Sequence, residues 1–214
     1  MTGSDAAPRA ATYHTSRAGA LRLLYFAYGS NMNPVQIKAR CLGAEVLAVA
    51  RLVDHRLAFF GTSMVWDGAL ETVVPAPGRD VWGVLYALSP LDADSLDAWQ
   101  DARFDGTGAY FHYPSVVIDV LGQRHDVLLY KKDLLGAPQK PSCEYLEHIA
   151  RGAEARGLPP QYVAHLRGLA AKKAAYPVPI PCCGEGGALR STTCADCGSL
   201  LEKAPQPKTT APHG

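Results

Sequence analysis

An apolar run that ends in a polar turn is the stretch of this sequence best suited to bind a small molecule. Residues 23–27 read Leu-Leu-Tyr-Phe-Ala, and residues 28–31 read Tyr-Gly-Ser-Asn. The run predicts a buried strand followed by a tight turn, with a short helix after Pro34. Main-chain N–H groups in such a turn can converge on one anionic or carbonyl oxygen. An ordinary turn with no ligand is the alternative that the spacing leaves open.

Four cysteines near the C-terminus have the chemistry of metal ligands. Cys194 and Cys197 are separated by two residues, a spacing that lets two thiolates reach one zinc ion. With the adjacent pair Cys182 and Cys183, they predict a four-thiolate structural zinc. A redox dithiol or disulfide of Cys194 and Cys197, or free thiols, are the open alternatives. A closed zinc site has no position for a substrate, so we expect no cofactor for catalysis.

The elements that must position these residues are mostly strands. Ser89-Pro90 predicts the start of a short amphipathic helix, and two longer helices follow, separated by residues 157–159. Neighbouring strands can pair as hairpins, which favours an α+β fold, a small mixed or antiparallel β-barrel with flanking helices. The remaining predicted strands are residues 46–53, 55–60, 71–74, 81–88, 113–120 and 125–130, and the two longer helices are residues 143–156 and 160–169.

Composition changes divide the chain into four parts. Residues 1–20 predict a flexible leader, and residues 21–176 contain the predicted barrel. Residues 177–202 combine a proline-rich linker with the cysteine-rich, zinc-ribbon-like appendage. Residues 203–214 are rich in Pro, Lys and Thr and predict a disordered tail.

The composition limits the kinds of partner. The chain has 214 residues, of which 48% are hydrophobic and 19% charged, with a net charge of +1. A balance of this kind does not favour nucleic acid or an acidic membrane surface as a partner. No apolar run reaches the roughly 20 residues that span a bilayer. We therefore expect a cytoplasmic protein with a small-molecule partner, and a homodimer or a protein partner bound through the ribbon.

Several short segments resemble segments of the γ-glutamylcyclotransferase family and follow one another in the same order as in that family. The most specific is Tyr28-Gly29-Ser30-Asn31, which in that family cradles a γ-glutamyl group. The resemblance extends over roughly residues 21–176. The other matching segments are Ala50-Arg51-Leu52-Val53-Asp54, Trp66-Asp67-Gly68, residues 77–86, Ser95-Leu96-Asp97 and residues 152–162.

The resemblance implies a barrel fold and an intramolecular reaction. The α-amine of a γ-glutamyl amide attacks its own γ-carbonyl, which closes the ring of 5-oxoproline and expels the amine. The loop residues Tyr28, Gly29, Ser30 and Asn31 would then bind substrate, and Tyr110 is expected at the pocket border. Tyr113 is a second candidate for the same border. Ordinary strand packing is the alternative for both tyrosines.

The sequence departs from the family at the catalytic carboxylate. The family has a glutamate three positions beyond the aspartate that corresponds to Asp97, and here that position is Gln100. The side-chain amide of glutamine neither takes up nor releases a proton near neutral pH, so it cannot act as an acid or a base. Glu71, a carboxylate in a predicted core strand, is a candidate for a relocated acid/base, because such burial is costly unless the group is solvated or used. Asp97 and Asp101 are further candidates.

Two functions therefore stay open at the level of the sequence. One is a cyclotransferase-like enzyme of a specialised pathway, and the other is a catalytically silent γ-glutamyl-binding or scaffold protein. The scattered histidines show no ligand spacing and are expected at surfaces or strand ends. They are His55, His112, His125, His148 and His165.

Overall fold

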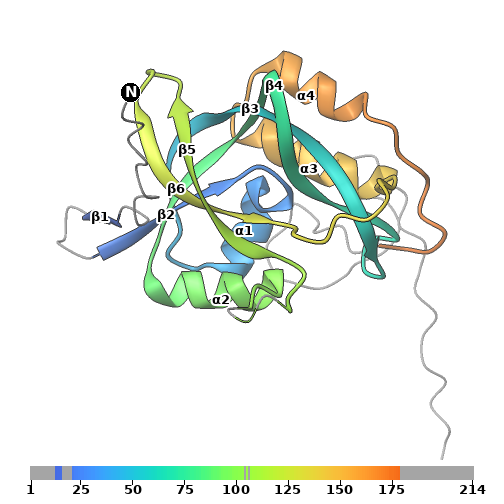
Figure 1. The fold of residues 1–214 in the computed structure, drawn as a ribbon, viewed down its shortest axis with the longest axis horizontal. Coiled ribbons are helices and arrows are strands. Elements are labelled where there is room, and N and C mark those ends of the chain that lie inside the picture. The colour runs from blue at the N-terminus through green and yellow to red at the C-terminus, as the bar shows by residue number, and fades with distance from the viewer. Residues whose placement is uncertain (1–12, 16–20, 104, 106, 179–214) are drawn as a thin grey trace, which may run out of the picture.

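Five strands of this chain close into a barrel (Figure 1). The structure, a computed structural model, describes residues 13–15, 21–103, 105 and 107–178. Neighbouring strands pair antiparallel, except that the first and last strands pair in parallel at Tyr25 and Leu128 and complete the ring. The predicted α+β barrel is confirmed. In their order around the barrel the strands are β2 (Leu21–Ala27), β4 (Gly68–Leu88), β3 (Glu45–Ser63), β5 (Phe111–Asp119) and β6 (Arg124–Lys131).

The longest hairpin corrects the predicted strand boundaries. The breaks left between the predicted strands, at Asp54 and over residues 75–80, lie inside β3 and β4. There the pairing jumps from Val53 opposite Asp80 to His55 opposite Pro75, so four residues of β4 are accommodated against Asp54. Asp54 has a φ of 55° and accepts a 2.8 Å hydrogen bond from Gly78 N–H, which stabilises the bulge.

A short strand also lies within the predicted flexible leader. Strand β1 (Tyr13–Thr15) pairs antiparallel with the beginning of β2. Order in these three residues differs from the prediction, because the edge of β2 offers free main-chain groups that another strand can pair with.

Several helices begin at residues whose side chains cap them. Asn33 accepts hydrogen bonds from the first turn of its helix, and Ser89 forms a capping box with Asp92. Figure 1 shows α3 and α4 beside one another, with α2 at a separate end of the barrel. The helices are η1 (Ser30–Met32, a 3-10 turn), α1 (Pro34–Arg40), α2 (Pro90–Gln100), α3 (Cys143–Ala155) and α4 (Pro160–Arg167).

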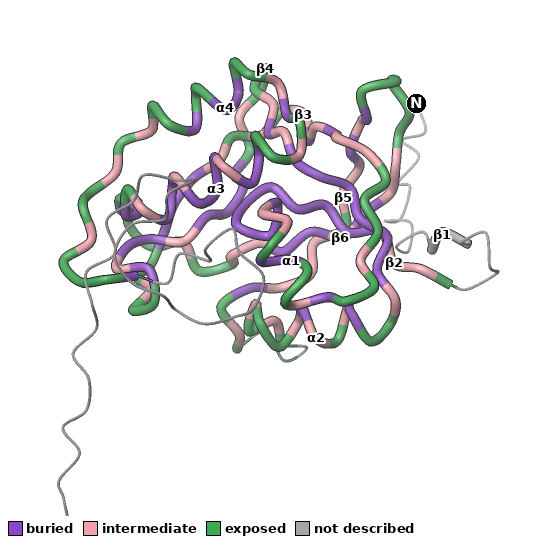
Figure 2. Tube along the Cα trace, turned by 180° about the vertical axis from the view of Figure 1, so that it is seen from behind, coloured by how far each residue is buried: buried purple, intermediate pink, exposed green. Residues whose placement is uncertain are grey.

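The apolar side chains form two large clusters, one on each side of the sheet. Leu24 and Phe26 of β2, with Tyr28 just after it, pack with residues of other strands, and this cluster fills the barrel. Tyr25 and Ala27, which point to the opposite side, pack with residues of the helices. Figure 2 shows the buried stretches running through the strands, with exposed residues on turns and outer helix faces. Strand β2 therefore contributes to both cores before it enters the polar loop.

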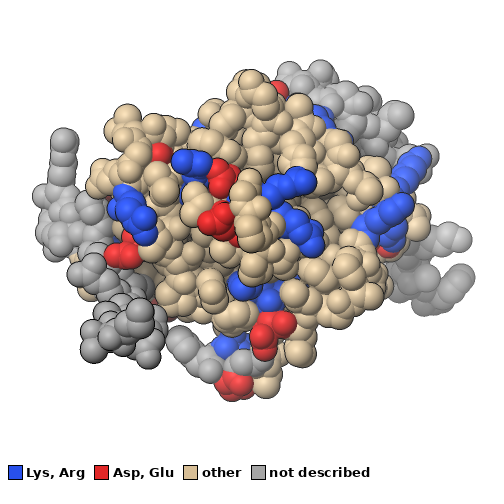
Figure 3. Space-filling view, turned by 45° about the horizontal axis from the view of Figure 1, so that its top comes forward, with Lys and Arg blue, Asp and Glu red and all other residues tan. Residues whose placement is uncertain are grey.

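One face of the molecule carries charges of both signs. Figure 3 shows acidic and basic side chains interspersed among uncharged ones on one face of the molecule. None of the helices in the described part of the chain combines the length and apolar character that a bilayer-spanning helix needs.

Candidate active site

The loop after β2 turns directly into a short 3-10 helix. Strand β2 ends at Ala27, and the first hydrogen bond of the turn runs from Met32 N–H to Gly29 O over 3.0 Å. The main-chain N–H groups of Ser30 and Asn31 come before that bond and have no acceptor within the turn. The loop therefore presents two main-chain donors that need partners from elsewhere.

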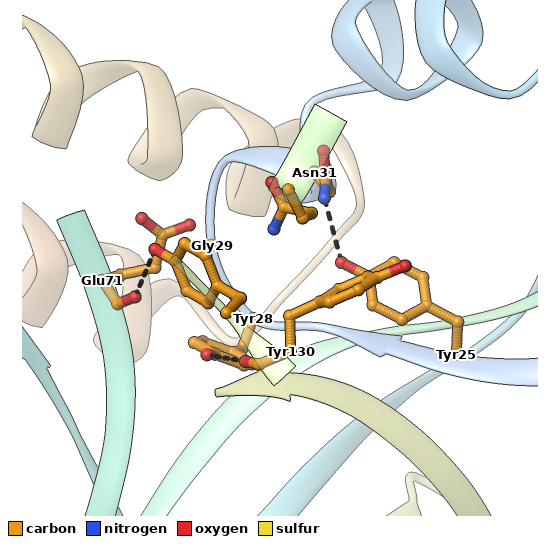
Figure 4. A pocket seen from close by; sticks show the side chains of 8 residues that line it. Tyr25, Tyr28, Gly29, Asn31, Glu71 and Tyr130 are labelled. Carbon is orange, nitrogen blue, oxygen red and sulfur yellow. Dashed lines mark hydrogen bonds between the residues drawn. The ribbon is translucent and has the colours of Figure 1, made fainter. Parts of the chain in front are cut away.

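One of these donors is bound by a carboxylate from the barrel. Glu71 on β4 is only 6% exposed, and its Oε1 accepts a 3.1 Å hydrogen bond from Ser30 N–H. Its Oε2 accepts a hydrogen bond from the hydroxyl of Tyr145 on α3. Glycine at position 29 permits this approach, because a Cβ there would lie 1.9 Å from Glu71 Oε1. Figure 4 shows the Glu71 side chain directed toward the loop.

Most of the predicted site residues line one small cavity, which lies between the loop, the barrel and the end of α2. Ser30 is not part of the lining but binds Glu71 through its N–H group. Tyr113 does not line the cavity either. The lining residues are Tyr25, Tyr28, Gly29, Asn31, Glu71, Gln100, Tyr110 and Tyr130.

Both candidate catalytic residues thus border the same space. Gln100 is the last residue of α2, and Glu71 reaches the cavity from β4. The family's usual carboxylate position and the candidate relocated carboxylate therefore line one cavity.

The other two candidate carboxylates are held elsewhere. Asp97 accepts a hydrogen bond from the Tyr130 hydroxyl and pairs with His112 at 2.6 Å. Asp101 ends α2 in a left-handed conformation and is bound by Arg103 Nε at 2.9 Å, which helps to lower the pKa of its carboxyl group. Neither lines the cavity, so Glu71 is the one carboxylate among its lining residues.

A buried polar network supports the loop from behind. The Gln36 amide donates to Ser30 Oγ at 2.8 Å and to Asn31 Oδ1 at 3.0 Å, and its oxygen contacts His148 Nε2 at 2.9 Å. His148 is 3% exposed and stacks on Trp66, so its expected surface position was wrong. Burial, reinforced by Arg40 and Arg151, lowers the pKa of His148 to about 4. The neutral ring can therefore donate to Gln36 and fix its orientation.

The hydroxyl groups around the cavity retain their protons. Burial, reinforced by the charge of Glu71, raises the pKa of Tyr28, Tyr110 and Tyr145 well above the ordinary tyrosine value. Burial also raises the pKa of Tyr130, whose hydroxyl faces Asp97. Each hydroxyl is therefore a hydrogen-bond donor at neutral pH.

Sequence reasoning missed Tyr25, Tyr130 and Tyr145. Tyr25 lies in the same run as the loop, and its alternation with Phe26 could have placed it on the helix side of the sheet. Tyr130 and Tyr145 are distant in sequence and reach the site only because β2 pairs with β6 and α3 packs over the loop. No local pattern marks these two residues.

The predicted zinc ligands Cys182, Cys183, Cys194 and Cys197 lie outside the described residues. Within the described ranges, no group of three His, Cys, Asp or Glu side chains could hold a metal ion. Of the remaining cysteines, Cys41 is buried, and Cys143 is exposed at the start of α3.

Comparison with known proteins identifies the class to which this barrel and loop belong. The model of a family described as AIG2-like matches residues 80–166, from the second half of β4 into α4. A solved structure of a γ-glutamyl cyclotransferase superposes with a TM-score of 0.69 at 31% sequence identity. The match covers 74% of this chain and 94% of that one.

Curated relatives narrow the class to one family. The chain is 32% identical over 154 residues to the γ-glutamylcyclotransferase of Homo sapiens, and the match covers 68% of this chain and 78% of that protein. The Mus musculus γ-glutamylcyclotransferase is 33% identical over 156 residues, with the same coverage. This chain belongs to the γ-glutamylcyclotransferase family.

Proposed function

We propose that this protein cleaves a γ-glutamyl amide by intramolecular cyclisation, releasing 5-oxoproline and a free amine, with Glu71 as the acid/base. Its relatives are named for this activity. The observation that carries the assignment of Glu71 is its place in the cavity, held by the Ser30 N–H group and the Tyr145 hydroxyl.

The chemistry needs a group that moves protons between two nitrogens. The α-ammonium loses two protons as its nitrogen becomes the ring amide, and the departing nitrogen gains two to leave as an ammonium ion. One carboxylate that alternates between base and acid can perform both transfers. Gln100 has no such capacity, whereas Glu71 has it and borders the same cavity.

Gln100 then has a binding role. Its amide can donate and accept hydrogen bonds, and it lies at the edge of the cavity where α2 ends. A neutral side chain at this position also avoids placing a second carboxylate close to Glu71, which would favour protonation of one of them.

A catalytically silent γ-glutamyl-binding protein is the second candidate. It is favoured by one observation: the Ser30 N–H group, a donor suited to the reacting carbonyl, is already bound by Glu71. In that case Glu71 would serve only to stabilise the loop.

The decisive experiment is an assay for 5-oxoproline with the full chain and a panel of γ-glutamyl amines. We expect release that is lost in Glu71→Ala, by about 10²–10⁴-fold in kcat, and retained in Gln100→Ala. Loss in Gln100→Ala alone, with Glu71→Ala active, would reverse the assignment of the acid/base. No release from any member of the panel would favour the silent protein.

The biological setting is part of the same proposal. The cysteine-rich segment after residue 177 suits a specialised pathway enzyme better than a general scavenger of γ-glutamyl compounds. Its partner would be one particular γ-glutamyl amide, with the ribbon serving for docking or self-association. A strong preference for one amine within the panel would support this setting, and equal rates across the panel would contradict it.

A further inference from the structure

The orientation of the Asn31 side chain is fixed by its neighbours. Asn31 Oδ1 accepts hydrogen bonds from Arg40 Nη1 at 2.8 Å and from Gln36 Nε2 at 3.0 Å. A guanidinium group can only donate, so the atom of Asn31 that faces Arg40 must be the oxygen. The amide nitrogen of Asn31 consequently faces the Tyr25 hydroxyl oxygen, at 3.0 Å, and donates to it.

The proton of the Tyr25 hydroxyl must therefore point elsewhere. A hydroxyl has one proton to donate, and here its oxygen already serves as the acceptor for Asn31. Burial raises the pKa of Tyr25, so the proton is present at neutral pH. No acceptor for this proton exists among the described residues, and Tyr25 lines the cavity. Figure 4 shows its ring beside Asn31 at the cavity wall.

Tyr25 differs in this respect from the other tyrosines around the site. Each of the others donates its proton to a protein oxygen and has none left for a ligand. Their acceptors are the main-chain oxygen of Tyr130 for Tyr28, the main-chain oxygen of Asn31 for Tyr86, the main-chain oxygen of Glu71 for Tyr110, Asp97 Oδ1 for Tyr130 and Glu71 Oε2 for Tyr145.

We infer that the Tyr25 hydroxyl is the side-chain donor that stabilises the oxyanion formed at the γ-carbonyl during cyclisation. This assignment rests on the proposed function. It also answers a difficulty in that function, because Ser30 N–H, one of the two main-chain donors of the loop, is already held by Glu71. Arg40 and Asn31 then act as positioning residues, since they direct the Tyr25 proton into the cavity.

The step balances without a further reactant. The α-nitrogen forms a bond to the γ-carbon while the carbonyl π electrons move to oxygen, where Tyr25 donates a hydrogen bond and keeps its proton. When the carbonyl re-forms, the bond to the departing nitrogen breaks, and Glu71 delivers to that nitrogen, one after the other, the two protons taken from the α-nitrogen. Tyr25 is unchanged at the end of the cycle.

The test begins with Tyr25→Phe, which removes the hydroxyl group and keeps the aromatic ring. The centroid of this ring lies 5.4 Å from that of the Tyr130 ring. We expect kcat to fall by about 10²–10³-fold with KM little changed, as for the loss of one oxyanion donor. Tyr113→Phe removes a hydroxyl that does not line the cavity and is expected to behave as the wild type. A Tyr25→Phe enzyme with wild-type kcat would overturn the inference and leave the proposed function standing.

A second readout separates a donor to the substrate from a support of the loop. A γ-glutamyl thioamide carries sulfur, a weaker acceptor, in place of the reacting oxygen. The ratio of the oxo-amide rate to the thioamide rate should shrink in Tyr25→Phe relative to the wild type. Tyr86→Phe removes a hydroxyl that bonds to the Asn31 main chain at 3.3 Å and should leave this ratio unchanged. An unchanged ratio in Tyr25→Phe would show a structural role only.

Binding of 5-oxoproline, measured by calorimetry, distinguishes failure of this inference from failure of the proposed function. A wild-type protein that binds 5-oxoproline without turnover, and loses affinity in Tyr25→Phe, would retain Tyr25 as a ligand donor and overturn the proposed reaction. A protein that neither turns over the panel nor binds 5-oxoproline would overturn both.

Discussion

The side chain of Glu71 occupies the space that a side chain at position 29 would fill. A Cβ built at Gly29 would lie 1.9 Å from Glu71 Oε1 and 2.5 Å from its Cγ. The φ of Gly29 is −127°, so glycine is required for the approach of the carboxylate and not for an unusual turn. The glycine of the loop and the carboxylate of β4 thus form a matched pair.

Gly29→Ala should therefore displace the Glu71 carboxylate from Ser30 N–H. We expect a loss of stability of about 1–3 kcal/mol, typical of overpacking, together with loss of 5-oxoproline release. Chemical denaturation and the turnover assay measure the two effects. Gly168→Ala is the matched control, because its Cβ would meet its nearest atoms at 3.5 Å. Unchanged activity in Gly29→Ala would contradict a catalytic role for Glu71 in this position.

Placing a carboxylate at position 100 in a protein that lacks Glu71 tests whether the catalytic carboxylate has been relocated from α2 to β4. In a Glu71→Ala background, Gln100→Glu returns a carboxylate to the family's usual position on α2. We expect it to recover part of the roughly 10²–10⁴-fold loss caused by Glu71→Ala. Gln100→Ala in the same background is the control and should recover nothing. Equal recovery by both second substitutions would show that proton transfer does not explain the effect.

His148 should make stability depend on pH. Its pKa is near 6.5 in an unfolded chain and about 4 in the fold, because burial disfavours the charged ring. Between these values the unfolded state binds a proton that the folded state does not, so stability falls as pH falls, by up to about 1.4 kcal/mol per pH unit. Denaturation midpoints from pH 7 to pH 4 should fall less steeply in His148→Gln. Parallel curves for the two proteins would show that another group is responsible.

The capping box at the start of α2 should contribute to the stability of the fold. Asp92 is 7% exposed, accepts from Ser89 Oγ at 2.6 Å and accepts from Gly43 N–H at 3.1 Å, which ties α2 to the segment after α1. We expect Asp92→Ala to cost about 1–2 kcal/mol, because it removes both the partly buried bond from Gly43 N–H and the Asp92 half of the capping box. Ser89→Ala removes the cap alone and should cost about 1 kcal/mol. The order of the two unfolding free energies is the test, and the reverse order would contradict it.

The predicted zinc site can be tested on the full chain. Protein purified without chelator should contain about one zinc ion per molecule, and Cys194→Ser should remove it. Elemental analysis measures the metal directly. Cys143→Ser serves as the control, since Cys143 is an exposed thiol at the start of α3. A metal-free wild-type protein would favour the dithiol or free-thiol alternatives.

The sequence was most informative where a local pattern carries the structure. The apolar run before Gly29, the cap at Ser89 and the hairpin of β5 and β6 all follow from short-range rules and appear as predicted. Glu71 was noticeable as well, because a carboxylate in an apolar strand needs a reason to be there. These predictions needed no knowledge of distant contacts.

Where the fold depends on long-range packing, the same rules failed. The prolines near residue 75 suggest a turn, but Asp54 and Gly78 adopt left-handed conformations that absorb the extra residues as a bulge. His148 resembles a surface residue of an amphipathic helix until Trp66 and Gln36 cover it. The donor role of Tyr25 depends on Arg40 through Asn31, a chain of contacts that no spacing reveals.

The single parallel contact between β2 and β6, at Tyr25 and Leu128, gives the cavity an unusual dependence on the whole domain. Two of the residues that line the cavity lie on these strands, Tyr25 on β2 and Tyr130 on β6. The two strands pair with each other only at this contact. A chain that has assembled every hairpin but not yet joined its first strand to its last lacks the wall of the cavity that Tyr130 forms. Ligand binding would therefore report completion of the barrel.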